Sequence, residues 1–563
     1  LAAFAGVFFY FKSMNEKKYL NIARISLHAS LSGIIIMSFI LLLLILNHQY
    51  QYIYVFNNSS NDLQFGLLAS TFYAGQEGSF LFWLLCLAVI GIFLVSFTKK
   101  HDLEPSVMAA FGIILVFLLL LLINKTPFEK IWTVYPEAIR TGVPPAGVPI
   151  IHLSPSTWVV IPSDGNGLNP LLQNFWMQIH PPILFIGFSF MAVPFAFAVS
   201  ALLIGDYRKW VKLTMPWLLI GSFFLGAGLF LGAFWAYETL GWGGYWGWDP
   251  VENSSLIPWI VGIALIHTLI TQLKTGGLIK TNLFLAIITF VLVVYSTFLT
   301  RSGVLQDSSV HSFTQPGSVV YLLLFIFLFT ILFLGVGLLL YRLRDISSEK
   351  SEYNLLSKEV MLSVGSIVLG ISALIIFAGT SYPIFSKAAV DTSFYDNWNL
   401  PLVILMNVMN ALSLIIDWNS DSVKNVIKRI VYGFVLALVM TTPVVLLGVT
   451  NVIMIILVTS CFFAIVFNME KLIKNIKSGV INIGGVLSHI GVALFLLGVV
   501  GSGKYSQTKH MELPLGQSKE AFGYQFTYLG EELFDAGKKS YFNVKVQQEG
   551  SSDFILKPVM FVN

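Results

Sequence analysis

The sequence predicts an all-α polytopic membrane protein of about 14 transmembrane helices, with a small outward-facing C-terminal β-rich domain. Two features of composition indicate the membrane class: 56% of the 563 residues are hydrophobic and 11% are charged, whereas about a quarter of a soluble domain is charged. So few charged residues cannot cover the surface of a water-soluble chain of this length. The third observation is a long series of apolar stretches.

Each expected transmembrane helix is an apolar stretch of roughly 20 residues, the length that crosses a hydrocarbon core of about 30 Å. Beyond residue 501 the apolar runs stop, the share of charged residues rises, and alternation typical of strands appears in YQFTYLG and YFNVKVQQ. We therefore expect a transmembrane domain over 1–501 and an outward β-rich domain over 502–563. The expected spans are centred in 1–11, 25–47, 79–98, 105–124, 183–205, 216–237, 253–272, 281–300, 319–341, 360–380, 400–416, 430–448, 450–467 and 481–500.

The lysine and arginine residues predict the orientation, because positive residues beside a span are retained on the cytoplasmic side. They gather in every second connection, which places the other connections outside. The net charge of +4 is scattered over these clusters, so the sequence excludes nucleic-acid binding as a function class. The outward connections are 48–78, 125–182, 238–252, 301–318 and the chain after 501.

The most unusual outward segment is 234–259, FWAYETLGWGGYWGWDPVENSSLIPW, which holds five of the thirteen tryptophans. Glycines between the indoles let a flat ligand approach the backbone. We expect the indoles to form a stacking platform for a planar cofactor. Asp249, also assigned to the cofactor-binding residues, is expected to cap the next helix or to fix the loop. An interfacial aromatic belt is the alternative. The proposed cofactor-binding indoles are Trp235, Trp242, Trp246 and Trp248.

Two outward histidines narrow the choice of cofactor. His180 lies in QIHPPILF, and His311 lies in the outward loop SVHSF. Two imidazoles beside a flat apolar surface suit a haem, which needs axial nitrogen ligands for its iron. Haem propionates also require a cation, and Arg301 is the candidate by topology. The alternatives are polar interface residues for the histidines and an interfacial snorkelling arginine for Arg301.

His267 and His489 lie inside predicted spans, in ALIHTLI and LSHIGVA. An ionisable residue within a membrane span indicates a functional site. Counted from the cytoplasmic ends of their helices, both lie at similar depth, roughly 9 to 14 Å. They can therefore face one another and hold the iron of a second, b-type haem. The alternative is that each is hydrogen-bonded to other polar groups of the bundle.

Several motifs together resemble a known family. WGGYWGWDPVEN is similar to the tryptophan-rich "WWD" signature of haem-handling proteins of cytochrome c maturation. The flanking motifs resemble CcmF-type haem lyases, as does the combination of many spans with an outward C-terminal domain. The likeness covers most of residues 1–320 and returns around His489. A close paralogue that serves haem attachment to nitrite reductase remains open. The flanking motifs are LNPLLQ before IHPP, GQEGSFLFW at 75–83, TPFEK at 126–130 and RSGVLQ before SVHSF.

The resemblance implies a lyase that joins haem vinyl groups to the two thiols of CxxCH in apocytochrome c. In that family two outward histidines flank the tryptophan segment, and two membrane histidines bind a stable b haem. His180 and His311 match the outward pair, and His267 and His489 match the membrane pair. This chain has no CxxCH of its own, so a second haem is expected to be bound transiently as substrate.

The resemblance also implies partners and a location. Haem would arrive from a periplasmic haem chaperone of CcmE type, and the substrate apocytochrome c from thiol-reducing and docking subunits of CcmG and CcmH type. Membrane lipid and a quinol are further candidate partners. The location is the bacterial cytoplasmic (inner) membrane, with the tryptophan segment and the C-terminal domain on the periplasmic side. We assign no catalytic acid or base, since positioning would supply most of the rate.

The sequence departs from the family pattern at two points, and two other functions are alternatives to the haem lyase. The connection from Trp132 to Asp164 is longer than expected, and the final span expected after the outward domain is missing. With Leu1 at the start and a strand-like end, we expect both ends of the sequence to be incomplete. The rival functions are a haem exporter and a membrane redox cytochrome that oxidises quinol without forming bonds.

Overall fold

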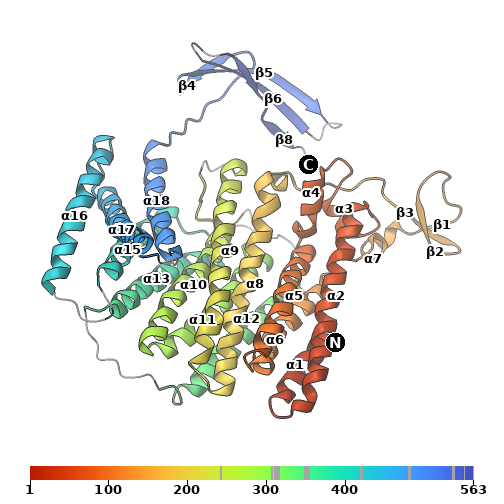
Figure 1. Ribbon diagram of the computed structural model, residues 1–563. Helices are drawn as coiled ribbons and strands as arrows, with labels where there is room; N and C mark the ends of the chain where they lie inside the picture. Colours follow the sequence, from red (N-terminus) through yellow and green to blue (C-terminus); the bar gives the residue numbers. More distant parts are fainter. Residues whose placement is uncertain are drawn as a thin grey trace. The chain divides into compact units, whose positions relative to one another are not determined.

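The computed structural model divides into two compact units, Leu1–Gly498 and Val499–Asn563. The first unit is helical, and the second contains a mostly antiparallel sheet (Figure 1). The division falls within the last long helix, close to the boundary expected after 501. The structure describes residues 1–240, 244–305, 309, 317–347, 356–386, 388–416, 418, 423–479, 483–534, 539–548, 550 and 552–561.

The N-terminal part of the helical unit begins with the twelve-residue α1 (Ala2–Ser13), followed by long apolar helices. Their length and hydropathy suit a hydrocarbon core. Short helices α3 (Ile53–Asn58), α4 (Phe65–Ser70) and α7 (Ile131–Val134) lie in the connections. The long helices are α2 (Leu20–Leu46), α5 (Gln76–Lys99), α6 (Glu104–Asn124), α8 (Phe175–Ile204), α9 (Lys209–Thr239), α10 (Pro250–Thr275), α11 (Ile279–Arg301) and α12 (Ser318–Arg342).

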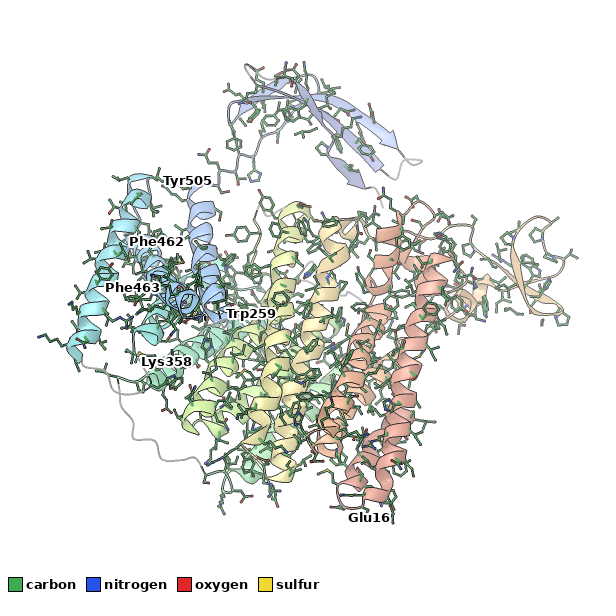
Figure 2. The ribbon with its side chains drawn as sticks, in the orientation of Figure 1. Glu16, Trp259, Lys358, Phe462, Phe463 and Tyr505 are labelled. Carbon is green, nitrogen blue, oxygen red and sulfur yellow. The ribbon has the colours of Figure 1, made fainter. Side chains whose placement is uncertain are left out.

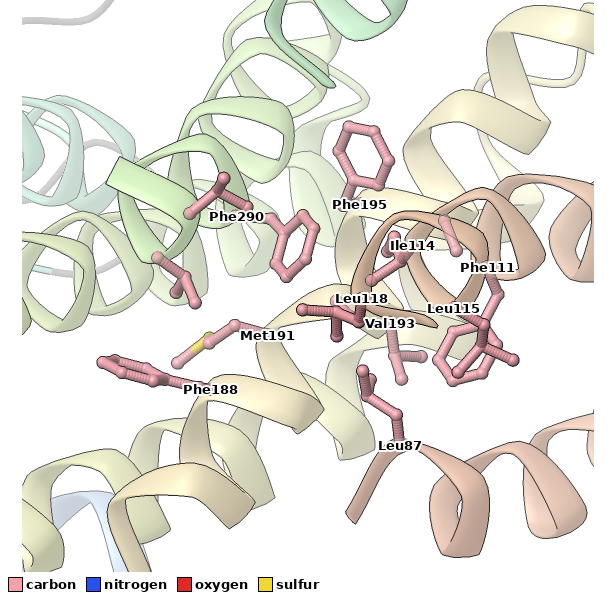
Figure 3. Packing of buried hydrophobic residues seen from close by; sticks show 14 of the residues in the cluster. Leu87, Phe111, Ile114, Leu115, Leu118, Phe188, Met191, Val193, Phe195 and Phe290 are labelled. Carbon is pink, nitrogen blue, oxygen red and sulfur yellow. The ribbon is translucent and has the colours of Figure 1, made fainter. Parts of the chain in front are cut away.

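Helix α8 forms the centre of this part, with 78% of its most apolar 18-residue window buried. Its Phe188, Met191 and Phe195 belong to one core with side chains of α5, α6 and α11, as Figure 3 shows. Helix α9 lies directly against α8: a Cβ at Gly187 would stand 2.6 Å from the backbone nitrogen of Leu225. Glycine at 187 therefore lets the two backbones touch, as small residues do between membrane helices.

The remaining helices pack in sequence from α10 outward. Helix α13 packs on α10, α15 on α13, and α17 on both α15 and α16. A small apolar core that includes Phe463 and Phe467 of α17 joins this group. The helices are α13 (Lys358–Ser381), α14 (Pro383–Ser386), α15 (Thr392–Ile415), α16 (Val423–Leu446), α17 (Val452–Lys477) and α18 (Gly484–Tyr505).

Two small antiparallel sheets complete the described fold. The connection between α7 and α8 contains a three-stranded sheet in the order β1-β3-β2, which the sequence analysis did not predict. The second unit contains β4 to β7 in sequential order, with β8 paired to β6. The strands are β1 (Arg140–Thr141), β2 (Ile150–Ser154), β3 (Thr157–Val160), β4 (Ser518–Ala521), β5 (Tyr524–Phe534), β6 (Lys539–Gln547), β7 (Phe554–Leu556) and β8 (Val559–Phe561).

The predicted fold class is confirmed. Thirteen helices of the described chain are long and apolar enough to cross a membrane, and Ala2–Ser13 is a shorter apolar helix where a fourteenth span was expected. The sheet of the second unit confirms the β-rich C-terminal region. The chain is therefore a multi-pass membrane protein.

Candidate functional sites

His180 lies in the second turn of α8, whose N-cap is Asn174. Its ring nitrogen Nδ1 is 2.7 Å from the backbone oxygen of Gly228 in α9. A carbonyl oxygen only accepts hydrogen bonds, so Nδ1 carries the proton and donates it. In this neutral tautomer Nε2 carries the lone pair, as in a metal-binding histidine whose other nitrogen is held by the backbone. The half-buried imidazole therefore has the orientation and the tautomer of a metal ligand.

A glycine in α9 makes this position possible. A Cβ at Gly232 would lie 2.6 Å from Cε1 and 2.9 Å from Nδ1 of His180. Side chains at Gly228 and Gly232 would each meet α8, since a Cβ at Gly228 would lie 2.9 Å from Cα of Leu184. The two glycines let α9 pass close to α8 and let the imidazole lie against the helix surface.

Trp248 is held by α15, which lies about 150 residues further along the chain. Its indole stacks on the buried ring of Tyr395, with centroids 4.8 Å apart and planes 10° apart. Its Nε1 donates to Oδ1 of Asp396 at 2.9 Å. Trp246 meets Trp248 edge to face at 6.0 Å and 89°. Both indoles are half-buried, so each is fixed in orientation and keeps some exposed surface.

The backbone around Trp248 is tied at several points. Trp248 has a φ of 52°, which a bulky residue adopts only where its surroundings fix it. Nδ2 of Asn253 donates to its carbonyl oxygen at 3.0 Å. Asp249 accepts from the backbone N–H of Val251 at 2.8 Å as the N-cap of α10. It also accepts from the hydroxyl of Ser309 at 2.8 Å, so it both caps the helix and binds a residue beyond the end of α11.

Trp235 does not lie on an exposed platform. Its side chain is 5% exposed, and its Nε1 donates to the backbone oxygen of Leu171 at 3.0 Å. It packs with Trp176 and Met177 at the beginning of α8. The sequence predicts Trp235 as one of the platform indoles, since it lies in the tryptophan-rich segment 234–259. In the structure the turn of α9 that carries Trp235 faces α8, so this indole packs against α8 and has little exposed surface.

Arg301 ends α11 and is buried rather than snorkelling, with 8% of its surface exposed. Its Nε donates to Oγ of Ser79 at 3.1 Å, and its carbonyl oxygen accepts from Nε2 of Gln76 at 2.9 Å. Its guanidinium lies over the rings of Phe80 and Phe185, at 5.8 and 5.3 Å from their centroids. These contacts place a cation at the end of the unit where α8 and α10 begin.

His267 of α10 and His489 of α18 face each other, with ring centroids 6.0 Å apart and planes 34° apart. Nδ1 of His267 donates to the backbone oxygen of Ile263 at 2.8 Å, which leaves the lone pair on Nε2. An iron shared by two imidazoles lies about 2 Å from each nitrogen, which places the ring centres about 6 Å apart. The separation of the two rings therefore fits one metal ion between them.

The surroundings of His489 also fit a large ligand. Only 17% of the most apolar window of α18 is buried. A Cβ added at Gly491 or Gly498 would meet nothing within 4 Å. Phe495 touches Phe230 of α9 edge to face at 5.0 Å. No cluster of three or more His, Cys, Asp or Glu side chains occurs in the described part of the chain. The two imidazoles match the two axial ligands that a porphyrin iron takes from a protein.

Comparisons with known proteins identify the family. Residues 73–306 match the family model described as "Cytochrome C assembly protein". The chain is 32% identical over 543 residues to the cytochrome c-type biogenesis protein CcmF of Pseudomonas fluorescens, covering 90% of this chain and 75% of the relative. This chain belongs to the CcmF family.

Two further matches agree with this assignment. The cytochrome c-type biogenesis protein NrfE of Haemophilus influenzae is 28% identical, covering 84% of this chain and 72% of the relative. The solved structure of "Cytochrome c Heme Lyase CcmF" has a TM-score of 0.73 at 23% identity, covering 99% of this chain and 84% of that one. The likeness to the solved structure confirms the fold, and membership of the CcmF family gives the chain a role in cytochrome c maturation.

The structure of this CcmF-family protein brings some predicted site residues together and leaves others undecided. Trp246, Trp248 and Asp249 form one ordered cluster, and His267 meets His489. Trp242 and His311 lie outside the described residues, so the outward histidine pair stays a prediction. The sequence analysis missed Tyr395 and Asp396, which hold Trp248. Their stretch of sequence, TSFYDNWNLP, shows polar residues at the start of an apolar helix, but nothing in it points to a distant tryptophan.

Proposed function

We propose that this CcmF-family protein is a haem lyase of the bacterial cytoplasmic membrane, which attaches haem to apocytochrome c on the periplasmic side. The observation that carries the proposal is that His180, in the tautomer of a metal ligand, lies at the same end of the helical unit as the ordered tryptophan segment. That end provides an axial ligand and aromatic surface, the two features that haem requires from a protein.

In this proposal the transferred haem is a substrate. It arrives from a periplasmic haem chaperone of CcmE type and stacks on one of the indoles of Trp246 and Trp248. It meets the other indole edge-on, because the two ring planes are 89° apart, and Trp242 is the third proposed indole of the platform. His180 and His311 bind its iron until the histidine of the substrate CxxCH motif replaces one of them. Arg301 is the proposed cation for its propionates. Membership of the CcmF family and the aromatic cluster around Trp248 support this arrangement.

The bond-forming step requires positioning more than acid or base chemistry. Each thiol S–H of apocytochrome c adds across a haem vinyl C=C, which forms a thioether and is redox-neutral. Thiol-reducing and docking subunits of CcmG and CcmH type would deliver the two thiols reduced. Holding haem and peptide in one orientation converts a bimolecular encounter into an intramolecular one, which lowers the barrier by up to about 7–11 kcal/mol. The fixed Trp248 suits this role, because its stacking and hydrogen bond restrict the platform to one orientation.

His267 and His489 would hold a resident b-type haem in the membrane. Their 6.0 Å ring separation supports this assignment. When bound, such a haem supplies single electrons, which keep the incoming haem iron reduced, with a quinol in the membrane as the electron source. The backbone hydrogen bond of His267 fixes the proton on Nδ1, which would leave Nε2 to bind the iron.

A complementation assay tests the proposed function. The chain is expressed in a bacterial host that lacks its own CcmF protein, together with the remaining maturation proteins and a reporter cytochrome c. Haem-stained reporter should appear with the wild-type chain and fall at least tenfold with His180→Ala. His28→Ala is the matched control, because His28 is exposed on α2 and should leave the yield unchanged.

Other outcomes would favour the rival functions. Release of free haem on the outer side without any stained reporter would indicate a haem exporter. Reduction of an added acceptor by quinol without stained reporter would indicate a redox cytochrome. Full yield in the His180→Ala variant would contradict the proposed ligand role of His180.

A further inference from the structure

We propose that Lys358, the first residue of α13, binds a propionate carboxylate of the haem held by His267 and His489. The inference rests on the proposed function, since it assumes that this histidine pair binds haem. It adds a binding residue for the anionic edge of the cofactor. Figure 2 labels Lys358 at the first turn of α13.

The packing of α13 against α10 fixes the level of Lys358. The two helices run antiparallel: Oγ1 of Thr275 donates to Oε1 of Glu359 at 3.1 Å, and Oγ of Ser366 donates to the backbone oxygen of Ala264 at 3.4 Å. His267 follows Ala264 by three positions and precedes Thr275 by eight. Its level on α13 therefore falls between position 363 (366 minus 3) and position 367 (359 plus 8).

This register gives the distance along the helix. Lys358 begins α13 five to nine residues before that level, which is about 8 to 14 Å at 1.5 Å per residue. The long side chain can cover several ångströms of this offset. A haem bound by these histidines would carry its propionates several ångströms from the iron, and the proposal directs one of them toward the first turn of α13. The offset of Lys358 is in the range that such a propionate reaches.

Lys358 lies within range of a weak charge interaction with His489. It also lies 6.0 Å from the ring centroid of Trp418, and the residue is half-buried. A lysine in the first turn of a helix is disfavoured by the helix dipole, whereas an anion placed there interacts favourably with both the ammonium and the helix end. Haem supplies such an anion in its two propionates.

A propionate of a haem bound here would need a cation, because its surroundings are apolar. A carboxylate that enters the edge of an apolar bundle loses hydration and must be paired. A lysine–carboxylate hydrogen bond is charge-assisted and stronger than a neutral one. The same positive charge favours the reduced haem, because reduction adds negative charge. Lys358 should therefore increase both the retention of the haem and its midpoint potential.

The test compares the complete, membrane-purified chain with Lys358→Met, Lys358→Arg and Lys280→Met variants. Lys280 is the matched control, because it is an exposed lysine in the first turn of α11, outside the contact with α13. Haem occupancy is measured from the b-type absorption spectrum, haem loss from transfer to excess apomyoglobin, and the midpoint potential by redox titration. Lys358→Met should lose haem about 10- to 100-fold faster and have a lower potential. Lys358→Arg and Lys280→Met should behave like the wild type.

A haem with esterified propionates makes the test specific to the carboxylate. The chains are reconstituted with haem dimethyl ester, and the difference between wild type and Lys358→Met should then disappear. A difference that persists would show that Lys358 acts on the fold or on a lipid phosphate and would overturn the inference. Equal haem loss and equal potential with ordinary haem would overturn it as well. A His267→Ala chain that retained the b-type spectrum would instead overturn the membrane haem site and this inference with it.

Discussion

The effect of Gly232→Ala can be worked out from the structure in detail. The added Cβ would lie 2.6 Å from Cε1 of His180, while ordinary contacts begin at 3.4 Å. The imidazole must therefore move by at least about 0.8 Å, the difference between these two distances. Nδ1 donates a hydrogen bond to the backbone oxygen of Gly228 at 2.7 Å. A shift of this size breaks or badly strains that hydrogen bond.

Loss of this hydrogen bond determines how much the binding of haem iron should weaken. A buried polar group left without its partner costs about 1–3 kcal/mol, which corresponds to about a 5- to 150-fold weaker hold on haem iron. The assay is the capture of haem from a loaded haem chaperone by the purified chain, together with the yield of haem-stained cytochrome c. The b-type spectrum should not change, because His267 and His489 lie on other helices.

Gly337→Ala in α12 is the control, since a Cβ there would meet nothing within 4 Å. Alanine also has the higher helix propensity, so this control should be neutral or slightly more stable. Haem capture by Gly232→Ala equal to that of Gly337→Ala would refute the argument that α9 sets the position of His180. Loss of the b-type spectrum in Gly232→Ala would show a general folding defect instead.

Three further substitutions test the framework around the sites. Asp249→Ala removes the N-cap of α10 and should lower the free energy of unfolding by about 1–2 kcal/mol, measured in thermal melts. Asp249→Asn should retain most of the wild-type stability, because asparagine also caps helices. Equal melting temperatures for Asp249→Ala and the wild type would contradict a stabilising role of the cap. Glu104→Ala leaves the partly exposed guanidinium of Arg24, which Glu104 holds at 2.6 and 2.8 Å, without its acceptor, and should cost about 1–3 kcal/mol in denaturant unfolding. Burial and the carboxylate of Asp164 raise the pKa of Tyr50 from 10 to about 12, so folding should lose stability as pH rises from 10 to 12; Tyr50→Phe should flatten that pH dependence.

Hydropathy predicted the helical framework because membrane spans need only length and apolar composition. The same reasoning could not detect the sheet of β1 to β3, whose strands have two to five residues and lie among turn residues. The contact between His267 and His489 could be predicted from their similar depths. The burial of Trp235 could not, since it depends on which side of α9 faces α8.

The hydrogen bond between Trp248 and Asp396 is a second contact that the sequence could not predict. A hydrogen bond between residues 148 positions apart follows from the packing of α15 near the beginning of α10, and no spacing rule describes that packing. Composition and motif order therefore singled out the tryptophan segment as a candidate site, while the orientations of Trp246 and Trp248 required the three-dimensional structure.

The unequal support of the two membrane histidines has a consequence for assembly. The imidazole of His267 is oriented by its own helix, through the oxygen of Ile263. His489 instead stands on a helix that makes few contacts along its length. Moving such a helix sideways would replace few protein contacts by lipid, so a haem bound as proposed could enter between α10 and α18 from the bilayer. An iron held by both imidazoles would then add a link between these two helices.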